Sequence, residues 1–317
     1  MPTVRTVRPT DLISLISFFR DGSHREVTAQ VWPEVLDGAG RQAIWSLVLR
    51  SIARPGGGTQ VWVYLARDGV RGLAVAHPRA SKLAWDVRDL FVADGDRSAA
   101  IDLLDRLSSE AAARGARRVF LATPIDVELA RIANRAGFVN YTSETLHSIR
   151  LTAPFASADS RPARPRLRQD THGLFQLYNA AVPCRVRMAE AMTVDEWSAL
   201  ERGGKPWAPS LGGSRQHLVW DDGDGPVGWL QISFGARSQH LEMLIHPSRR
   251  GETEQLVLAS LSQMSHRAPI YVSTREYQAE IAAVLEGLGF SRVADYLIFV
   301  RELAARVPSR AMVPARA

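Results

Sequence analysis

The sequence is poor in cysteine, with one residue of this type, Cys184, in 317 positions. A single cysteine excludes an internal disulfide bond and a cysteine-based zinc site, and it is typical of a reducing compartment. Long apolar runs are also missing, since one of the longest, residues 12–19, is far shorter than the roughly 18 residues of a membrane-spanning helix. The first residues are polar and do not resemble a secretion signal. We therefore expect a soluble, cytoplasmic protein.

Lysine is scarce as well, because Lys82 and Lys205 are the two lysines among 39 basic residues. The formal net charge of +6 and the pI near 10.0 would suit a nucleic-acid partner. The arginines, however, are spread among acidic residues and form no block of like charges. We attribute the excess to compositional bias and expect no specific nucleic-acid partner and no membrane partner. The eight histidines show no metal-ligand spacing, so we expect no bound metal.

What the sequence does contain is an internal repeat. A length of 317 residues exceeds the roughly 100–200 residues of a typical domain, which favours two domains. Both halves predict an acidic strand, a helix, a strand, a helix that ends at Gly-Phe, and a last strand. In the first half these elements are predicted at residues 86–92, 99–114, 118–122, 126–135 and 144–151. In the second half they are predicted at residues 240–245, 254–265, 270–273, 278–286 and 296–301.

The spacing of equivalent residues supports this duplication. Asp89 and Glu242 are 153 positions apart, and Gly137 and Gly289, which begin the Gly-Phe pairs, are 152 positions apart. Each half also predicts a strand and a helix at its start, and Asp11 is expected to cap the first helix. A hairpin follows in each half, with an Asp-Gly turn that supplies the positive φ of tight turns.

Composition sets the expected domain boundaries. A segment rich in Pro, Ala and Ser separates the two halves and predicts a linker. We expect an N-terminal domain at residues 1–151, a linker at 152–165, a C-terminal domain at 166–305 and a tail at 306–317. Glycine runs at 56–58, 203–204 and 212–213 precede strands, whereas a phosphate loop would precede a helix, so they predict flexible loops.

The repeated order resembles the GNAT superfamily of N-acetyltransferases, over essentially the whole chain and twice. The resemblance is carried by residues 89–92, by residues 244–251 and by the two helices that end in Gly-Phe. It implies an α/β fold with a mixed sheet in each unit, and thus two tandem GNAT-like acyl-CoA acyltransferase domains. It also implies splayed fourth and fifth strands, and a glycine-containing loop whose N–H groups hold the pyrophosphate of acetyl-CoA or another acyl-CoA.

By this resemblance, the C-terminal domain has the better cofactor site. Its loop matches the family in three consecutive residues, Arg249, Arg250 and Gly251. The corresponding loop of the first domain, residues 93–98, is shorter by about three residues and keeps one glycine, so we expect a degenerate site there. The cofactor-binding residues that the resemblance implies are Leu244, Ile245, Arg249, Arg250, Gly251, Glu252, Thr253 and Gln278.

Two departures from the family pattern leave a second interpretation open. Glu252 and Glu254 place negative charge beside the expected pyrophosphate. Family members commonly carry a tyrosine four residues before the Gly-Phe pair, where its hydroxyl can protonate the departing thiolate. Ala133 and Leu285 stand at these positions. The alternative is a non-catalytic tandem GNAT-like protein that acts as a small-molecule or protein binding or regulatory module.

Acyl transfer to an amine requires a base that removes a proton from the ammonium group. Glu242 is the candidate base and Asp89 is its counterpart, although each could instead be a strand carboxylate paired with an arginine. Cys184 has no placed histidine partner and is expected to be a passive thiol. The aromatic residues of the second half either line a pocket or pack in the core. They are Trp197, Trp207, Trp220, Trp229, Tyr271 and Tyr277.

The leading prediction is an acyltransferase that moves an acetyl or other acyl group from acyl-CoA to a small-molecule amine. The C-terminal domain is the expected active unit, with Glu242 as its base. The sequence defines neither the acceptor nor the acyl group, and it does not define the oligomeric state. It also leaves open how the two domains pack against each other.

Overall fold

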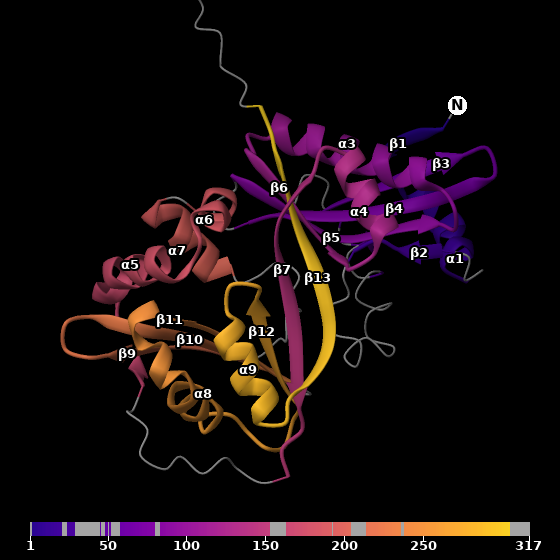
Figure 1. The fold of residues 1–317 in the computed structure, drawn as a ribbon. Coiled ribbons are helices and arrows are strands. Elements are labelled where there is room, and N and C mark those ends of the chain that lie inside the picture. The colour runs from indigo at the N-terminus through magenta and orange to yellow at the C-terminus, as the bar shows by residue number, and fades with distance from the viewer. Residues whose placement is uncertain are drawn as a thin grey trace, which may run out of the picture.

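The computed structural model describes residues 2–20, 24–28, 45, 48–49, 51, 58–79, 83–152, 163–191, 193–203, 214–235 and 238–304. Its strands form one 13-stranded sheet in the order β1-β3-β4-β5-β6-β13-β7-β12-β11-β10-β9-β8, with β2 paired to β5. The two repeats occupy the two ends of this sheet (Figure 1). The predicted mixed α/β fold is confirmed. The predicted tail, Trp207 and most of the glycine-rich loops and the linker lie outside the described residues.

The N-terminal repeat runs from β1 to β7. Its strands are β1 Thr3–Thr6, β2 His24–Glu26, β3 Gln60–Ala66, β4 Gly69–Pro78, β5 Ala84–Ala93, β6 Arg118–Pro124 and β7 Val139–Ile149. Its described helices of two turns or more are α1 Leu12–Arg20, α3 Arg97–Ala113 and α4 Val127–Arg135. The Asp126 carboxylate starts α4 by accepting two backbone N–H groups. Gly137, with a φ of 75°, turns the chain after α4 towards β7.

The C-terminal repeat runs from β8 to β13. Its strands are β8 Arg164–Pro165, β9 Arg215–Asp221, β10 Pro226–Phe234, β11 Gln239–Ile245, β12 Ile270–Arg275 and β13 Ser291–Glu302. Its helices are α5 Thr171–Ala181, α6 Cys184–Glu190, α7 Val194–Gly203, α8 Thr253–Leu261 and α9 Ala279–Gly287. A 3-10 segment, η3 Pro247–Glu252, joins β11 to α8.

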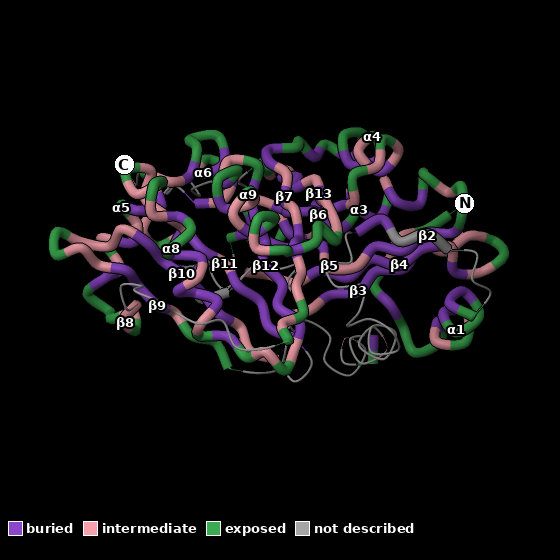
Figure 2. Tube along the Cα trace, turned by 60° about the horizontal axis from the view of Figure 1, so that its bottom comes forward, coloured by how far each residue is buried: buried purple, intermediate pink, exposed green. Residues whose placement is uncertain are grey.

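Alternating side chains give the sheet two buried faces. In the N-terminal repeat, one face packs against α3 and α4 and includes Trp62 and Leu90, while the other packs against α1 and includes Val63 and Phe91. In the C-terminal repeat, one face packs against α8 and α9 and the other against α5, α6 and α7. Figure 2 shows the central strands mostly buried between these layers. Burial of apolar area on both faces, at roughly 25 cal/mol per Å², is the main stabilising term.

The strand register confirms that Asp89 and Glu242 are equivalent. In β4 and β10, a glycine lies under a large side chain: a Cβ on Gly72 would lie 2.9 Å from Leu103, and one on Gly228 would lie 2.2 Å from the Trp220 ring. Gly72 and Gly228 pair with the fourth strands of their repeats at Val92 and Ile245. Three positions further along, Asp89 and Glu242 have the same register. On the N-terminal side of Asp89, Arg88 is an extra residue in a β-bulge of β5, so the next equivalent pair is Val87 and Leu241.

The fourth and fifth strands of each repeat separate, as the resemblance predicts. β5 and β6 are parallel and pair over three residues, ending at Asp86 and Phe120. β11 and β12 also pair over three residues, ending at Leu241 and Val272. Each pair then diverges, so the carboxyl-terminal half of β11 lies beside an opening in the sheet.

The last strands of the two repeats are exchanged. β13 inserts beside β6 of the N-terminal repeat, with Tyr296 opposite Pro124, and β7 inserts beside β12 of the C-terminal repeat, with Glu144 opposite Arg275. β7 and β13 also pair with each other in the middle of the sheet (Figure 1). The two repeats are therefore joined by continuous backbone hydrogen bonding rather than packed side by side.

Both repeats open with the same ion pair. Arg5 binds Asp11 through two hydrogen bonds of 2.7 Å, and Arg164 binds Asp170 through two of 2.8 Å. Each aspartate also accepts the backbone N–H three residues before it. Asp11 thus closes a 3-10 turn before α1 rather than capping α1 directly. Arg164 and Pro165, within the expected linker, pair with β9.

Among the described residues, no helix combines the length and the apolar character that crossing a membrane would require.

Candidate functional site

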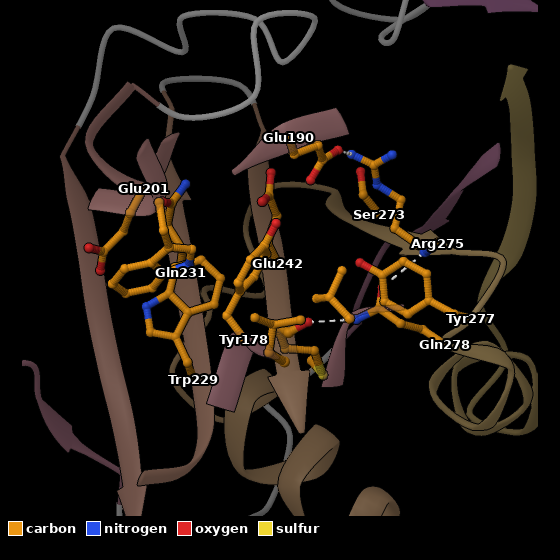
Figure 3. Close-up of a pocket in the computed structure, with 14 residues that line it drawn as sticks. Tyr178, Glu190, Glu201, Trp229, Gln231, Glu242, Ser273, Arg275, Tyr277 and Gln278 are labelled. Atoms are coloured by element: carbon orange, nitrogen blue, oxygen red, sulfur yellow. Dashed lines mark hydrogen bonds and ion pairs between the residues drawn. The ribbon is translucent and has the colours of Figure 1, made fainter. Parts of the chain in front are cut away.

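A cleft opens where β11 and β12 diverge, and α5, α6 and α7 cover it. It encloses about 720 Å³, including the part that is open to solvent. Figure 3 shows Gln231 and Glu242 on one side of the opening and Ser273, Arg275 and Tyr277 on the other, with the Glu201 carboxylate directed away from them. The lining residues are Tyr178, Val182, Glu190, Trp197, Glu201, Trp229, Gln231, Glu242, Met243, Leu244, Ser273, Arg275, Tyr277 and Gln278.

A smaller cavity of about 390 Å³, also counted with its open part, adjoins the cleft. The two share Leu244, Tyr277 and Gln278. The smaller cavity extends to η3 and to the beginnings of α8 and α9. Five residues of the predicted cofactor set line it, namely Leu244, Ile245, Arg250, Thr253 and Gln278. The other three, Arg249, Gly251 and Glu252, do not belong to its lining.

The loop after β11 is more tightly wound than an open phosphate loop. The N–H of Arg249 donates to the His246 carbonyl, and the cap N–H of Thr253 donates to the Arg250 carbonyl. Arg249 binds Asp222 at 2.5 Å and Glu252 at 3.0 Å, so Glu252 is turned towards Arg249. A Cβ added to Gly251 would meet no atom within 4 Å apart from its neighbours along the chain, so the space beside this glycine is open.

Arg250 and Gln278 hold the walls of the smaller cavity. Arg250 lies 3.3 Å from the Glu280 carboxylate of α9. The Gln278 amide donates to the Met243 carbonyl at 2.8 Å and accepts the N–H of Arg275 at 2.9 Å. Gln278 therefore connects β11 to β12 beyond the point where their pairing ends, and it fixes the width of the opening.

Glu242 faces the cleft. Its cross-strand neighbour Gln231 lines the same cleft, so this face of the two strands points towards α5 and α7. The Glu242 side chain is 12% exposed and lies 3.6 Å from Nδ1 of His240. Nε2 of His240 is 2.9 Å from the hydroxyl of Ser273, another lining residue. A partly buried carboxylate beside an imidazole can accept a proton from a group in the cleft.

Arg275 carries the positive charge of the cleft lining. Its guanidinium binds Glu144 of β7 at 3.0 Å and Glu190 of α6 at 2.9 Å, and Glu190 accepts a hydrogen bond of 2.7 Å from Tyr141. Burial opposes the charge of Arg275, but the carboxylates of Glu190 and Glu144 hold its pKa well above the usual value. Because Glu144 reaches the cleft on an exchanged strand, the N-terminal repeat contributes to the wall of this site.

Glu201 lies on another wall of the cleft, on α7. It binds Arg166 at 2.8 Å and lies 3.6 Å from His217. Burial, with the nearby charges of Arg166 and Arg215, lowers the pKa of His217 to about 4. His217 is therefore neutral near pH 7, and Arg166 is the cation that balances Glu201.

The predicted aromatic residues divide between the cleft and the core. Trp197, Trp229 and Tyr277 line the cleft, whereas Trp220 and Tyr271 are fully buried in the core. Tyr178, which was not predicted, completes the aromatic wall, with its ring 6.4 Å from that of Trp197. Burial raises the pKa of Tyr277 well above its usual value, so its hydroxyl stays protonated.

The equivalent region of the N-terminal repeat is organised differently. Asp96 caps α3 by accepting the Ala99 N–H at 3.1 Å, and it binds Arg71 at 3.2 Å. A carboxylate of the chain thus occupies the helix end at which a phosphate would bind. Burial raises the pKa of Asp89 to about 6, partly offset by Arg88 at 3.5 Å. Ala133, like its counterpart Leu285, is fully buried in a hydrophobic cluster.

Several lining residues had no sequence signal. Glu190, Glu201 and Tyr178 come from the helices between the Arg164–Asp170 pair and β9, where a single polar residue on a helix looks like ordinary surface. Ser273 is the last residue of the strand predicted at 270–273, and Arg275 lies two residues beyond it, at the end of β12. Among the described residues, no group of three or more His, Cys, Asp and Glu side chains is placed to hold a metal ion. Cys184 is exposed at the start of α6, outside the cleft lining.

No family model and no curated protein matches the sequence. The structure, however, is similar to solved structures. A GCN5-related N-acetyltransferase from Sphaerobacter thermophilus aligns with a TM-score of 0.58 at 13% identity, covering 95% of both chains. A putative acetyltransferase from Pyrococcus horikoshii aligns with a TM-score of 0.52 at 12% identity, covering 96% of this chain and 90% of that one.

A third similar structure is a tandem GNAT protein from the clavulanic acid biosynthesis pathway. It aligns with a TM-score of 0.51 at 12% identity, covering 95% of this chain and 98% of that one. At these identities the likeness concerns the fold, and it extends over both repeats. The chain therefore has the fold of the GNAT N-acetyltransferases, in its tandem form.

Proposed function

We propose that the protein transfers an acetyl or other acyl group from acyl-CoA to an amine in the C-terminal repeat. The observation that carries this proposal is the pair of connected cavities at the opening between β11 and β12. One adjoins the N-terminal end of α8, and the other contains Glu242. A thioester placed at their junction would face an acceptor amine held beside this carboxylate.

The smaller cavity is the proposed site for the phosphate-bearing part of acyl-CoA. Arg250 and the N-terminal end of α8 at Thr253 supply positive charge there. Arg250 is also paired with Glu280, and several loop amides are already bonded within the loop. We therefore expect acyl-CoA to displace Glu280 from Arg250, at some cost in affinity.

Glu242 is the proposed base. It accepts a proton from the ammonium group, and the neutral nitrogen then attacks the thioester carbon. Beyond Leu241 the backbone of β11 is no longer paired with β12, so its N–H groups on that side are placed to bind the oxyanion. When the carbon–sulfur bond breaks, the thiolate takes a proton.

Tyr277 is the proposed donor of that proton. It lines both cavities, and Figure 3 shows its ring at the edge of the cleft beside Gln278. Because burial keeps its hydroxyl protonated, it can serve as a general acid near neutral pH. It thereby supplies a phenol that is missing at Leu285.

The test is direct detection of product. Purified protein is incubated with acetyl-CoA and a panel of primary amines, and acetylated amine is measured by mass spectrometry together with free thiol. We expect turnover that is lost in Glu242→Gln. Stabilisation by acetyl-CoA in a thermal-shift titration should remain in this variant, because Glu242 does not line the smaller cavity.

A non-catalytic binding module is the second candidate. The bonded amides of the loop and the Arg250–Glu280 pair favour it. In that case acetyl-CoA at millimolar concentration would give no thermal stabilisation, and no amine would be acetylated.

A further inference from the structure

Carboxylates outnumber guanidinium groups around the larger cleft. Glu201 is balanced by Arg166, and Arg275 is shared by two carboxylates, Glu190 and Glu144, while Glu242 lines the same cleft beside His240. The Arg275 side chain is 5% exposed and already binds two carboxylates, Glu190 and Glu144. A ligand carboxylate would therefore meet a guanidinium that already binds two carboxylates, through Nε and Nη2. An ammonium group, in contrast, would be attracted.

The apolar part of the lining is aromatic. Tyr178, Trp197 and Trp229 stand on the α5–α7 side of Glu242, and a cation or a flat ring packs well against such faces. Two polar atoms of this wall, the Tyr178 hydroxyl and the Trp229 indole N–H, are buried and have no hydrogen-bond partner among the described residues. Tyr178 is 3% exposed and Trp229 is 8% exposed. Because both residues line the cleft, a polar atom of a ligand there can pair with them.

We propose that the acceptor is an arylalkylamine, that is, a primary amine on an aromatic body with a polar atom on the ring and no carboxylate. This inference rests on the acyl transfer proposed above. The ammonium group faces Glu242, the ring lies against Trp197 and Trp229, and the ring substituent pairs with Tyr178 or Trp229. The amine nitrogen bonds to the acyl carbon, the carbon–sulfur bond breaks, Glu242 takes one proton, and the thiolate receives another.

The exchanged strand takes part in this selectivity. Glu144 lies on β7 directly opposite Arg275, because β7 pairs with β12 of the other repeat. Together with Glu190 it engages the guanidinium that would otherwise attract an amino-acid carboxylate. The N-terminal repeat thus acts on acceptor choice without a reacting group of its own.

The test compares tyramine with tyrosine, which differ by the carboxylate. We expect kcat/KM for tyramine to exceed that for tyrosine by about 100-fold or more. Glu190→Gln and Glu144→Gln, which each release one partner of Arg275, should lower this ratio by about tenfold. Glu276→Gln, an exposed carboxylate paired with Arg185 outside the cleft lining, is the control and should leave the ratio unchanged.

The ratio is insensitive to folding losses, because both substrates are measured on the same preparation. Three results would overturn the inference while acyl transfer stands: equal or better use of tyrosine, a preference for the linear diamine cadaverine over tyramine, or an unchanged ratio in both cleft variants. If no amine is acetylated, the proposed function itself fails and the inference fails with it.

Discussion

The two repeats have the same frame but differ at the helix that follows their fourth strand. In the N-terminal repeat, the Asp96 carboxylate caps α3 and binds Arg71. In the C-terminal repeat, Glu252 precedes α8 but makes no side-chain cap bond, and its carboxylate turns to Arg249. The end of α8 is left beside a cavity. The two repeats thus differ in a capped helix end, at α3, and an uncapped one beside a cavity, at α8.

The fourth strands of the two repeats, β5 and β11, also differ in what surrounds their equivalent carboxylates. Asp89 is 16% exposed, partial burial raises its pKa to about 6, and its neighbour Arg88 is the extra residue of a β-bulge. Glu242 occupies the same register position but lines a cleft of about 720 Å³. Equivalent carboxylates therefore have different neighbours: Asp89 lies beside Arg88, whereas Glu242 lines a cleft beside His240.

The largest expected effect concerns these two carboxylates. Glu242→Gln should lower kcat by about 10²- to 10⁴-fold, because it removes the proposed base. Asp89→Asn, the same chemical change at the equivalent position, should leave kcat within about twofold, since we propose no reaction in that repeat. Steady-state kinetics with acetyl-CoA measure both. Equal losses in the two variants would remove the functional difference between the repeats.

Tyr277→Phe should lower kcat by about 10- to 100-fold, because a departing thiolate would lose its proton donor. The loss should shrink with an aryl thioester, whose thiolate is more stable and needs less protonation. Tyr296→Phe, which removes a buried phenol outside the cleft lining, is the control. A loss that does not depend on the leaving group would assign Tyr277 to packing alone.

Asp89 should also set a pH dependence of stability. Its folded-state pKa of about 6 lies above the usual value, so ionisation costs stability as pH rises from about 4 and the full cost is present above about 6. The increase in the free energy of unfolding caused by Asp89→Asn should therefore be about 1–3 kcal/mol larger at pH 8 than at pH 4. Urea unfolding at both values measures this. Asp94→Asn, in the exposed turn after the same strand, is the surface control for the substitution itself.

The smallest effect compares the two helix ends. Asp96→Ala should cost about 1 kcal/mol at pH 7, since it removes the cap of α3. Although burial opposes ionisation, hydrogen bonds from Ser98, Ala99 and Arg71 keep the pKa of Asp96 below its usual value, so the cost should decline as pH falls towards that pKa. Glu252→Ala should cost less, because that side chain makes no cap bond. If thermal unfolding shows a greater loss of stability for Glu252→Ala than for Asp96→Ala, the assignment of α3 as the capped helix is wrong.

Local patterns were sufficient to predict much of this structure. The duplication followed from the equal spacing of Asp89 with Glu242 and of Gly137 with Gly289, and the register confirms the first pair. The Asp-Gly turns predicted the hairpins, because positive φ at Gly69 and Gly223 is a local requirement. The splay of the strands came from the resemblance, and the pairing bears it out.

Other features depend on contacts between distant parts of the chain. The exchange of β7 and β13 could not be predicted, because both strands alternate in the same way and periodicity does not specify a partner. The direction of Glu242 was undecided for a related reason, since apolar residues flank it on both faces of β11. Glu190 and Glu201 look like surface residues of amphipathic helices until those helices cover the cleft.

The strand exchange also bears on how the chain is made. β6 ends at Pro124, but its partner β13 begins at Ser291, so the first repeat emerges from the ribosome with an unfinished sheet edge. That edge stays open until almost the whole described chain has been synthesised. Completion of the sheet is then one late, long-range event, which is expected to be slow and to require protection of the nascent chain from aggregation.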